Sequence, residues 1–227
     1  MRRGSVGRVY QPAHKRFAAD PAVMLTELAA LVPATLVTMG ADGLRASILP
    51  MLFDPGDGPH GTLRGHLARP NGQWRDFDPE VEALAIFNGP DAYISPAWYE
   101  EKRLTGKVVP TWNYTTVQAH GPLTLHHEPE WLVAHVRQLT DRHESGRAEP
   151  WSIDDAPDGY VEAQARAIVG LELRISRLEG KRKLSQNRSA ADFEGVRDAL
   201  AVGSPLEQAV AAEMRREAPP RTRPDRS

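Results

Sequence analysis

Two donor-rich segments of this sequence have the composition of an anion-binding site. The first, GHLARPNGQW at 65–74, follows an apolar run and gathers His66, Arg69, Asn71 and Trp74. Arginine suits a phosphate because its planar guanidinium donates two parallel hydrogen bonds. Taken alone, the segment is better described as a polar turn, with Arg69 in a surface ion pair and His66 satisfied in the core.

The second segment, KRKLSQN at 181–187, combines two lysines, an arginine, a hydroxyl and two amides. Backbone and side-chain donors gathered in one loop can cradle an anion. Lys183, Ser185 and Gln186 are its candidate contacts. A solvated basic turn before the next helix explains the same composition, and the residues alone do not decide between the two interpretations.

An aromatic segment at 87–114 indicates that such a ligand would also carry a flat ring system. It holds three of the five Tyr and two of the five Trp, interleaved with amides, hydroxyls and prolines. Trp112 and Asn113 are neighbours within it. Rings mixed with polar groups on a stiffened backbone suit a flat, partly polar ligand that is both stacked and hydrogen-bonded.

Composition excludes several other kinds of site. The chain has 227 residues, no Cys and a formal net charge of −2, so it lacks thiolate ligands and a positive field for nucleic acid. Eight His show no metal-ligand spacing, and no nucleophile motif or phosphate-binding glycine motif is present. No catalytic residue and no metal site are therefore predicted. No apolar run is long enough to span a bilayer, and we expect a cytoplasmic protein without a membrane segment.

Periodicity predicts a mainly β fold with added helices. Asp20 and Pro21 start a helix that ends before Pro33. Six strands are predicted at 35–39, 45–53, 62–68, 83–87, 113–125 and 169–178, with turn clusters at 40–43, 54–61, 70–72 and 88–91 and an end at Gly180. Helices are predicted at roughly 128–142, at 158–167, after an N-cap at Ser189, and at 205–216. His135 and His143 lie two turns apart along the first of these helices, and we expect both to face solvent.

This organisation predicts one domain with no linker inside it. We expect a flexible N-terminus at 1–8, a single split-barrel domain with helical additions at 9–200, a C-terminal helix at 201–217 and a disordered tail at 218–227.

Seven segments in order resemble the PaiB family of FMN-binding split-barrel proteins. They are VYQPAH (9–14), GHLARPNGQW (65–74), FNGPDAYISPAWY (87–99), VVPTWNY (108–114), LTDRHE (139–144), IVGLELRISRLEGK (168–181) and KLSQN (183–187). The sequence departs from the family at Ile48, where many relatives carry His, and at Gly72, where they carry Pro.

The resemblance implies a six-stranded split β-barrel that forms a homodimer and binds FMN in clefts between its subunits. Arg69 and Asn71 would then face the phosphate, Lys183, Ser185 and Gln186 would add donors, and Trp112 and Asn113 would lie near the ring system. His66 and Trp74 belong to the same motif and complete the predicted cofactor-binding set.

Members of this family are often described as negative transcriptional regulators, which makes a flavin-dependent regulator the expected function. DNA is a partner by resemblance only, since neither the net charge nor a helix-turn-helix pattern supports it. The alternatives are a flavin oxidoreductase or a haem-dependent, N–N bond-forming enzyme related to piperazate synthases, with His66 or Tyr93 as the available axial ligands. A plain flavin-binding module remains a third interpretation.

Overall fold

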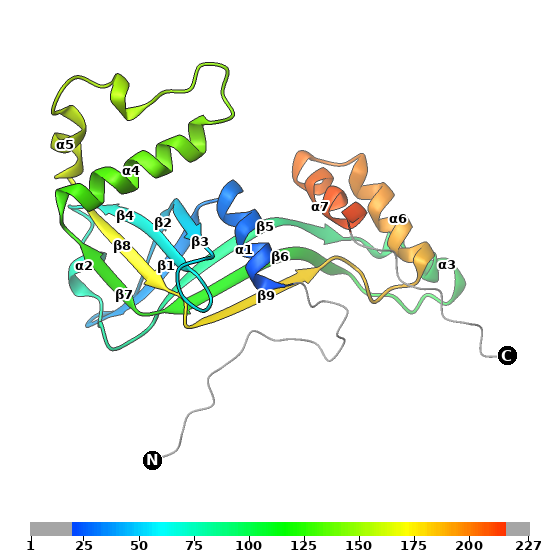
Figure 1. Cartoon of the computed structure of the whole chain (residues 1–227). Coiled ribbons are helices and arrows are strands. Elements are labelled where there is room, and N and C mark those ends of the chain that lie inside the picture. The colour runs from blue at the N-terminus through cyan, green and yellow to red at the C-terminus, as the bar shows by residue number, and fades with distance from the viewer. Residues whose placement is uncertain (1–19, 217–227) are drawn as a thin grey trace, which may run out of the picture. The chain divides into compact units, whose positions relative to one another are not determined.

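The computed structural model describes residues 20–216 (Figure 1). The expectations for 1–8 and for 218–227 lie outside this range. The strands are β1 (Ala34–Gly40), β2 (Gly43–Leu49), β3 (Met51–Asp54), β4 (Thr62–Ala68), β5 (Ala83–Ile94), β6 (Thr111–Gly121), β7 (Leu123–His126), β8 (Ile168–Arg174) and β9 (Arg177–Lys183). The helices are α1 (Pro21–Leu31), α2 (Gln73–Asp76), α3 (Glu101–Leu104), α4 (Pro129–Glu144), α5 (Tyr160–Ala165), α6 (Ala190–Ala201) and α7 (Pro205–Arg216).

The strands number nine in the described residues because three of the six predicted strands are each divided in two. Pro50 separates β2 from β3, and Pro122 separates β6 from β7. Proline has no N–H to donate to a strand ladder, so a continuous pairing stops there. The third division falls at 175–176, between β8 and β9.

Two predicted strand ends are wrong. The cluster at 88–91 does not form a turn, because β5 continues through it to Ile94. Gly180 does not end a strand, because β9 continues to Lys183. In both cases the extended backbone lies beside β6 in the sheet, and pairing with a neighbouring strand outweighs the local turn preference of Gly, Asn and Pro.

The strands form two sheets, one with the order β2-β1-β5-β6-β9 and one with the order β3-β4-β8-β7. In the second sheet β4 and β8 are antiparallel and in register along their whole length, from Thr62 opposite Arg174 to Ala68 opposite Ile168. A mainly β fold with added helices is therefore confirmed.

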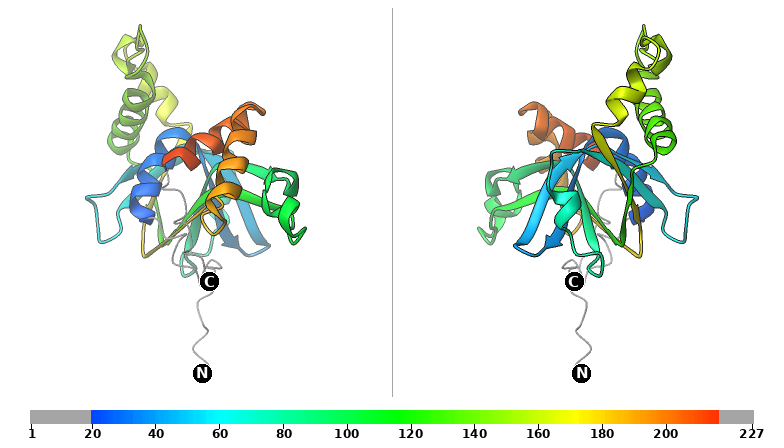
Figure 2. Two further views of the ribbon diagram at one scale, coloured as in Figure 1. Left: turned by 90° about the vertical axis from the view of Figure 1, so that its right-hand side faces the viewer. Right: turned by 90° about the vertical axis from the view of Figure 1, so that its left-hand side faces the viewer.

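The chain divides into two compact units, and β5, β6 and β9 each run from one into the other. Among the described residues the first unit holds 20–21, 88–117 and 179–216, and the second holds 22–87 and 118–178. In the first unit, α6 and α7 pack against each other (Figures 1 and 2). Their shared core contains Ile94, Tyr99, Leu184, Phe193, Val196, Leu200, Val210 and Met214.

In the second unit, α4 contacts both β8 and α5. Leu63 and Leu67 of β4 and Leu171 and Leu173 of β8 are buried in this unit. None of the helices within 20–216 combines the length and apolar character that crossing a membrane requires.

Candidate functional site

Five of the predicted cofactor residues lie in the first unit, where β6 and β9 are neighbouring strands. Trp112 and Asn113 are near the start of β6, Lys183 ends β9, and Ser185 and Gln186 follow it. The ammonium of Lys183 donates hydrogen bonds to the hydroxyl of Thr111 and, at 2.7 Å, to the carbonyl oxygen of Trp112. The structure thus joins two segments of the predicted site that are about 70 residues apart in sequence.

Lys183 belongs to a group of three cations with Lys181 and Arg188, which we call the Lys183 cluster. The Nζ atoms of Lys181 and Lys183 lie 5.4 and 5.8 Å from the ring centroid of Tyr114, within cation–π range. Partial burial lowers the pKa of Lys183 below its ordinary value, and the charges of Lys181 and Arg188 lower it further. Within 20–216 no carboxylate pairs with Lys183, so a ligand anion would not have to displace a carboxylate from its ammonium group.

An exposed aromatic pair adjoins the Lys183 cluster. Tyr93 of β5 and Trp112 of β6 meet edge to face, with ring centroids 6.0 Å apart and an interplanar angle of 73°. Their exposed fractions are 46% and 52%, which is high for such large rings. The carbonyl oxygen of Trp112 also accepts a hydrogen bond from Lys183. The start of β6 therefore holds both the exposed indole ring and the ammonium group of Lys183.

Asn113, Ser185 and Gln186 are buried and bind other parts of the loop. The hydroxyl of Ser185 donates to Asn113 Oδ1 at 3.1 Å. Gln186 accepts from the backbone N–H of Leu184 at 2.7 Å and donates to the carbonyl of Arg182 at 2.8 Å. Ser185 has a φ of 64°, and no other non-glycine residue described has a positive φ. These contacts fix the loop shape behind Lys183, and a direct role for the three residues in binding a cofactor stays a prediction.

The remaining predicted residues lie in the second unit, and three of them, Arg69, Asn71 and Trp74, hold a loop after β4. Arg69 donates from Nε to the carbonyl of Arg166 and from Nη2 to the carbonyl of Ile168, both at 2.8 Å. The indole N–H of Trp74 donates to the carbonyl of Arg69 at 3.0 Å. Asn71 donates to the hydroxyl of Ser47 at 2.9 Å. Arg69 thus has carbonyl partners where a surface ion pair was an alternative, and its contact with phosphate stays a prediction.

His66 contacts a histidine that the sequence did not single out as a partner. Its Nδ1 lies 3.1 Å from Nε2 of His135 on α4. The expectation that His135 faces solvent is wrong, since its side chain is 3% exposed, whereas His143 on the same helix is exposed. Helical spacing predicts this burial, because His135 falls three residues after the buried Leu132 and so lies on the apolar face of the helix.

A ring stack extends from this histidine pair. The indole of Trp131 lies between the imidazole of His126, at a centroid distance of 4.2 Å, and that of His135, at 5.2 Å. Burial lowers the pKa of His66, and burial followed by the charges of His66 and Arg64 lowers the pKa of His135 to about 4. His66 and His135 are therefore neutral at physiological pH, and the stacked rings connect α4 to the second sheet.

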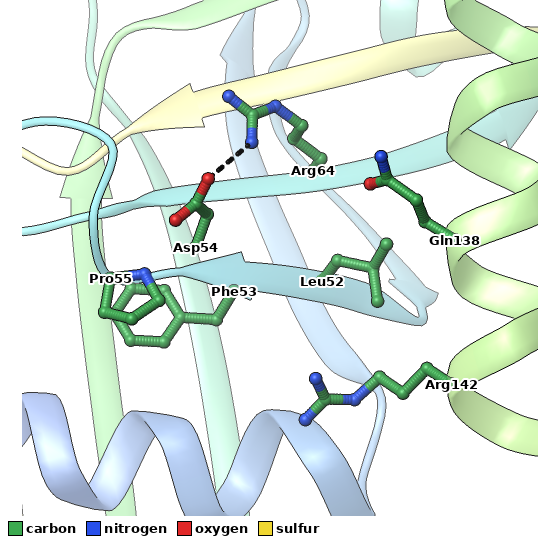
Figure 3. A pocket seen from close by; sticks show the side chains of 7 residues that line it. All are labelled: Leu52, Phe53, Asp54, Pro55, Arg64, Gln138 and Arg142. Atoms are coloured by element: carbon green, nitrogen blue, oxygen red, sulfur yellow. Dashed lines mark hydrogen bonds and ion pairs between the residues drawn. The ribbon is translucent and has the colours of Figure 1, made fainter. Parts of the chain in front are cut away.

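A cavity of about 310 Å³ with both polar and apolar walls lies between β3 and α4 in the second unit (Figure 3). Arg64, on its wall, bonds the carboxylates of Asp54, Asp57 and Glu172. Burial alone would lower the pKa of Arg64, but the bonds from Glu172 and Asp57 outweigh it and raise the pKa. With its charge already matched by three carboxylates, Arg64 is a structural cation.

Comparison with known proteins identifies the sequence family. Residues 9–177 match a family model described as "Putative FMN-binding domain". The chain is 32% identical over 166 residues to the "Protease synthase and sporulation protein PAI 2" of Bacillus subtilis, a match that covers 73% of this chain and 77% of that protein. It is also 35% identical over 194 residues to an uncharacterized protein of Aspergillus fumigatus, covering 67% and 74% of the two chains.

Solved structures with a similar fold are more distant in sequence. The FAD and haem binding protein of Mycobacterium smegmatis superposes with a TM-score of 0.52 at 15% identity, covering 74% of each chain. The flavocytochrome Anf3 of Azotobacter vinelandii gives 0.50 at 13% identity, covering 74% of this chain and 68% of that one. At these identities the likeness concerns the fold alone, and it agrees with the predicted split-barrel class.

Proposed function

This chain belongs to the FMN-binding domain family, and from that premise we propose that it binds FMN, with the phosphate held at the Lys183 cluster. The observation that carries the proposal is the group of three cations at the end of β9, in which Lys183 has only neutral oxygen partners. A phosphate monoester carries about −1.5 to −2 charges at neutral pH. Its approach would favour the charged form of Lys183, whose pKa is lowered by burial and then by the charges of Lys181 and Arg188.

The ring system of FMN requires a different kind of surface, and the Tyr93–Trp112 pair supports it. Two half-exposed rings beside a cation suit a flat heteroaromatic group that has a charged tail. When bound, a flavin supplies one- and two-electron redox chemistry of its own. The protein residues would bind the tail, cover part of the ring from water and hold it in one orientation.

The remaining predicted residues have support of a different kind. His66, Arg69, Asn71 and Trp74 are assigned to the cofactor by resemblance, and they lie in the second unit. Arg69 uses Nε and Nη2 on carbonyl oxygens, which leaves Nη1 for a ligand. We keep them as predicted contributors and test them separately from Lys183.

We further propose that the protein is a homodimer, as its family resemblance implies. One face of the first sheet supports this proposal, and we call it the β1–β2 face. Its residues are Val37, Met39, Leu44, Ala46, Ile48, Leu84 and Ile86, with Thr35 the one polar member, and all belong to paired positions of β1, β2 and β5. Leu44 and Ile48 are 70% and 74% exposed. A contiguous apolar sheet face of this kind is typical of an interface between subunits.

A regulatory role for the flavin-bound protein is the functional class we propose. The related Bacillus subtilis protein is named for protease synthesis and sporulation, which fits regulation more readily than metabolism. With a net charge of −2 the chain lacks the field that attracts DNA, so we propose that a protein partner or the flavin itself transmits the signal. The alternative is a redox or haem enzyme, since two proteins of similar fold are named for haem or cytochrome content.

The absorbance spectrum of the purified protein is the first test. Flavin bands with FMN released on denaturation support the proposal, a Soret band supports the haem alternative, and a colourless protein that takes up neither cofactor refutes both. Titration then tests the phosphate site with Lys183→Met, which removes the ammonium group and keeps an unbranched side chain. We expect FMN to bind at least tenfold more weakly, about 1.4 kcal/mol.

Riboflavin, which lacks the phosphate, provides the matched comparison. The Lys183→Met change should alter riboflavin affinity by less than twofold, and Lys107→Met, at an exposed position of the same unit, should alter neither. An equal loss of affinity for FMN and riboflavin, or no loss of affinity for FMN, would show that Lys183 does not bind the phosphate. A parallel titration of Arg69→Ala shows whether the second unit contributes to FMN binding.

A further inference from the structure

A second, mostly apolar cavity lies within the second unit, between α4, α5 and the paired ends of β4 and β8. Its volume is about 390 Å³, toward the lower end of the range for small-molecule sites. Its apolar walls are formed by Ala68, Val136, Ile153, Val161, Ala165, Ala167 and Ile168. Two aromatic rings that are about half exposed, Trp151 and Tyr160, also line it.

The lining of this cavity carries no formal charge. No Asp, Glu, Lys or Arg is found among the described residues that line it. Transfer of an ionised group into such surroundings is costly, because nothing compensates the lost hydration. The phosphate of FMN therefore has no counter-charge here, and the cavity favours a neutral ligand.

Five side chains of the lining can form hydrogen bonds, namely His66, Thr140 and Gln164, together with the indole N–H of Trp151 and the hydroxyl of Tyr160. In the part of the chain that the structure describes, the hydroxyl of Thr140 and the amide of Gln164 make no hydrogen bond to protein. They can therefore bind a ligand without giving up an internal partner.

The contact between the two histidines determines what His66 can offer. One of His66 Nδ1 and His135 Nε2, 3.1 Å apart, must donate to the other. His135 Nδ1 is buried without a hydrogen-bond partner. A buried N–H without a partner is rarer than a buried acceptor without one, so the proton of His135 belongs on Nε2. His66 then accepts at Nδ1 and carries its own proton on Nε2, where it is a donor.

We propose that this cavity binds a small, neutral, planar ring compound that presents a carbonyl or an unprotonated ring nitrogen to His66 Nε2. A polar N–H of the same compound would be received by Gln164 or Thr140, and its ring would lie among the aliphatic walls beside Trp151. The site is built from the second unit alone, so it does not depend on the FMN assignment at Lys183.

Benzamide is a suitable probe because it combines a flat ring, a carbonyl and an amide N–H without charge. Titration followed by the indole N–H signal of Trp151 in two-dimensional NMR should show saturable binding, with a dissociation constant on the order of 1 mM, about 4 kcal/mol. Benzoate has the same shape with a negative charge and should bind at least tenfold more weakly. Toluene lacks the carbonyl, and we expect it to bind at least threefold more weakly than benzamide.

A pair of variants locates the binding. Ala68→Trp places a large ring at an exposed position of the cavity lining and should abolish benzamide binding, whereas Ala163→Trp, at an exposed position of α5 outside the lining, should leave it unchanged. Gln164→Ala removes a surface group that folding does not require and should weaken binding about threefold. Circular dichroism verifies that each variant is folded.

Several results would overturn the inference. Absence of saturable benzamide binding, equal binding of benzoate, or retention of binding in folded Ala68→Trp would each do so. Loss of FMN binding in Ala68→Trp but not in Ala163→Trp would assign the cavity to the flavin. Haemin uptake that Ala68→Trp alone prevents would assign it to haem. Failure of FMN to bind at Lys183, by contrast, leaves the benzamide result untouched.

Discussion

The Nδ1 atom of His66 lies 3.1 Å from the Nε2 atom of His135, so β4 and α4 are joined by two neutral imidazoles. His135 is 3% exposed, and its contact with His66 works only while at least one of the facing nitrogens is unprotonated. Protonation of both rings would place two positive charges together in a poorly hydrated position. Acid should therefore weaken this contact before it affects most of the fold.

The first prediction concerns the pH dependence of stability. The pKa of His135 is about 4 in the folded protein, against 6.5 in the unfolded chain, so the unfolded state binds more protons between these values. The stability contributed by neutral His135 is complete above pH 6.5, falls as the pH drops toward 4, and is lost below that. From pH 7 to pH 4.5 the free energy of unfolding should fall by about 2–3 kcal/mol on this account, measured by urea denaturation.

Two variants separate this effect from general acid sensitivity. His135→Gln removes the titrating group, so its stability should depend less on pH across this window than that of the parent protein. His143→Gln changes an exposed histidine of the same helix and should retain the parent pH dependence. Identical pH profiles for the parent and His135→Gln would contradict the assignment.

The second prediction tests the packing of Trp131 against β8. A Cβ atom added at Gly170 would lie 2.2 Å from Cζ3 of Trp131. The indole has little freedom to move because it is stacked between His126 and His135. Gly170→Ala should therefore reduce the free energy of unfolding by about 1–3 kcal/mol, as measured by thermal or chemical denaturation.

A double-mutant cycle attributes this loss to the indole. In a Trp131→Leu background the added methyl meets a smaller side chain, and Gly170→Ala should cost at least 0.5 kcal/mol less, which is roughly the lower limit for coupled neighbours. Gly146→Ala is the matched control, because a Cβ atom there has no neighbour within 4 Å. Equal costs in both backgrounds would mean that Trp131 is not the obstacle.

The third prediction concerns the backbone at Ser185, whose φ of 64° favours glycine. Ser185→Ala and Ser185→Gly both remove the hydrogen bond to Asn113, but only glycine relieves the left-handed strain. We expect Ser185→Gly to be more stable than Ser185→Ala by about 1 kcal/mol. Chemical denaturation of the two variants measures the difference, and the opposite order would show that the left-handed conformation is not retained in solution.

Part of the architecture follows from local sequence patterns. The strand at 62–68 and the helix at 205–216 have the predicted bounds, because each is set by local chemistry. An apolar run between turn residues defines the strand, and a proline at the first turn starts the helix. The hydroxyl of Ser189 accepts from the backbone N–H of Asp192 and caps α6, as its spacing predicts.

Long-range pairing determines the features that the sequence did not reveal. The turn-forming residues at 88–91 are extended because β5 runs beside β6, and no local pattern encodes that neighbour. The same applies to Lys183 and Trp112, which meet only because β9 lies beside β6. The two compact units share three strands, so no linker marks the boundary between them.

The last prediction tests the β1–β2 face as a subunit interface. Leu44→Lys with Ile48→Lys places two charges on the exposed apolar side of β2, opposite Met39 and Thr35 in the sheet register. A lysine buried between subunits without a partner is costly, so the double variant should be monomeric where the parent protein is dimeric. Light scattering after size-exclusion chromatography measures the mass of each.

The control for this prediction is Leu31→Lys, which changes an equally exposed leucine on α1, 78% accessible and outside the β1–β2 face. It should remain dimeric with an unchanged far-ultraviolet spectrum. Because Leu44 and Ile48 project from the sheet rather than into its core, the double variant should also stay folded, which separates dissociation from unfolding. A parent protein that is already monomeric, or a double variant that stays dimeric, would show that this face is not the interface.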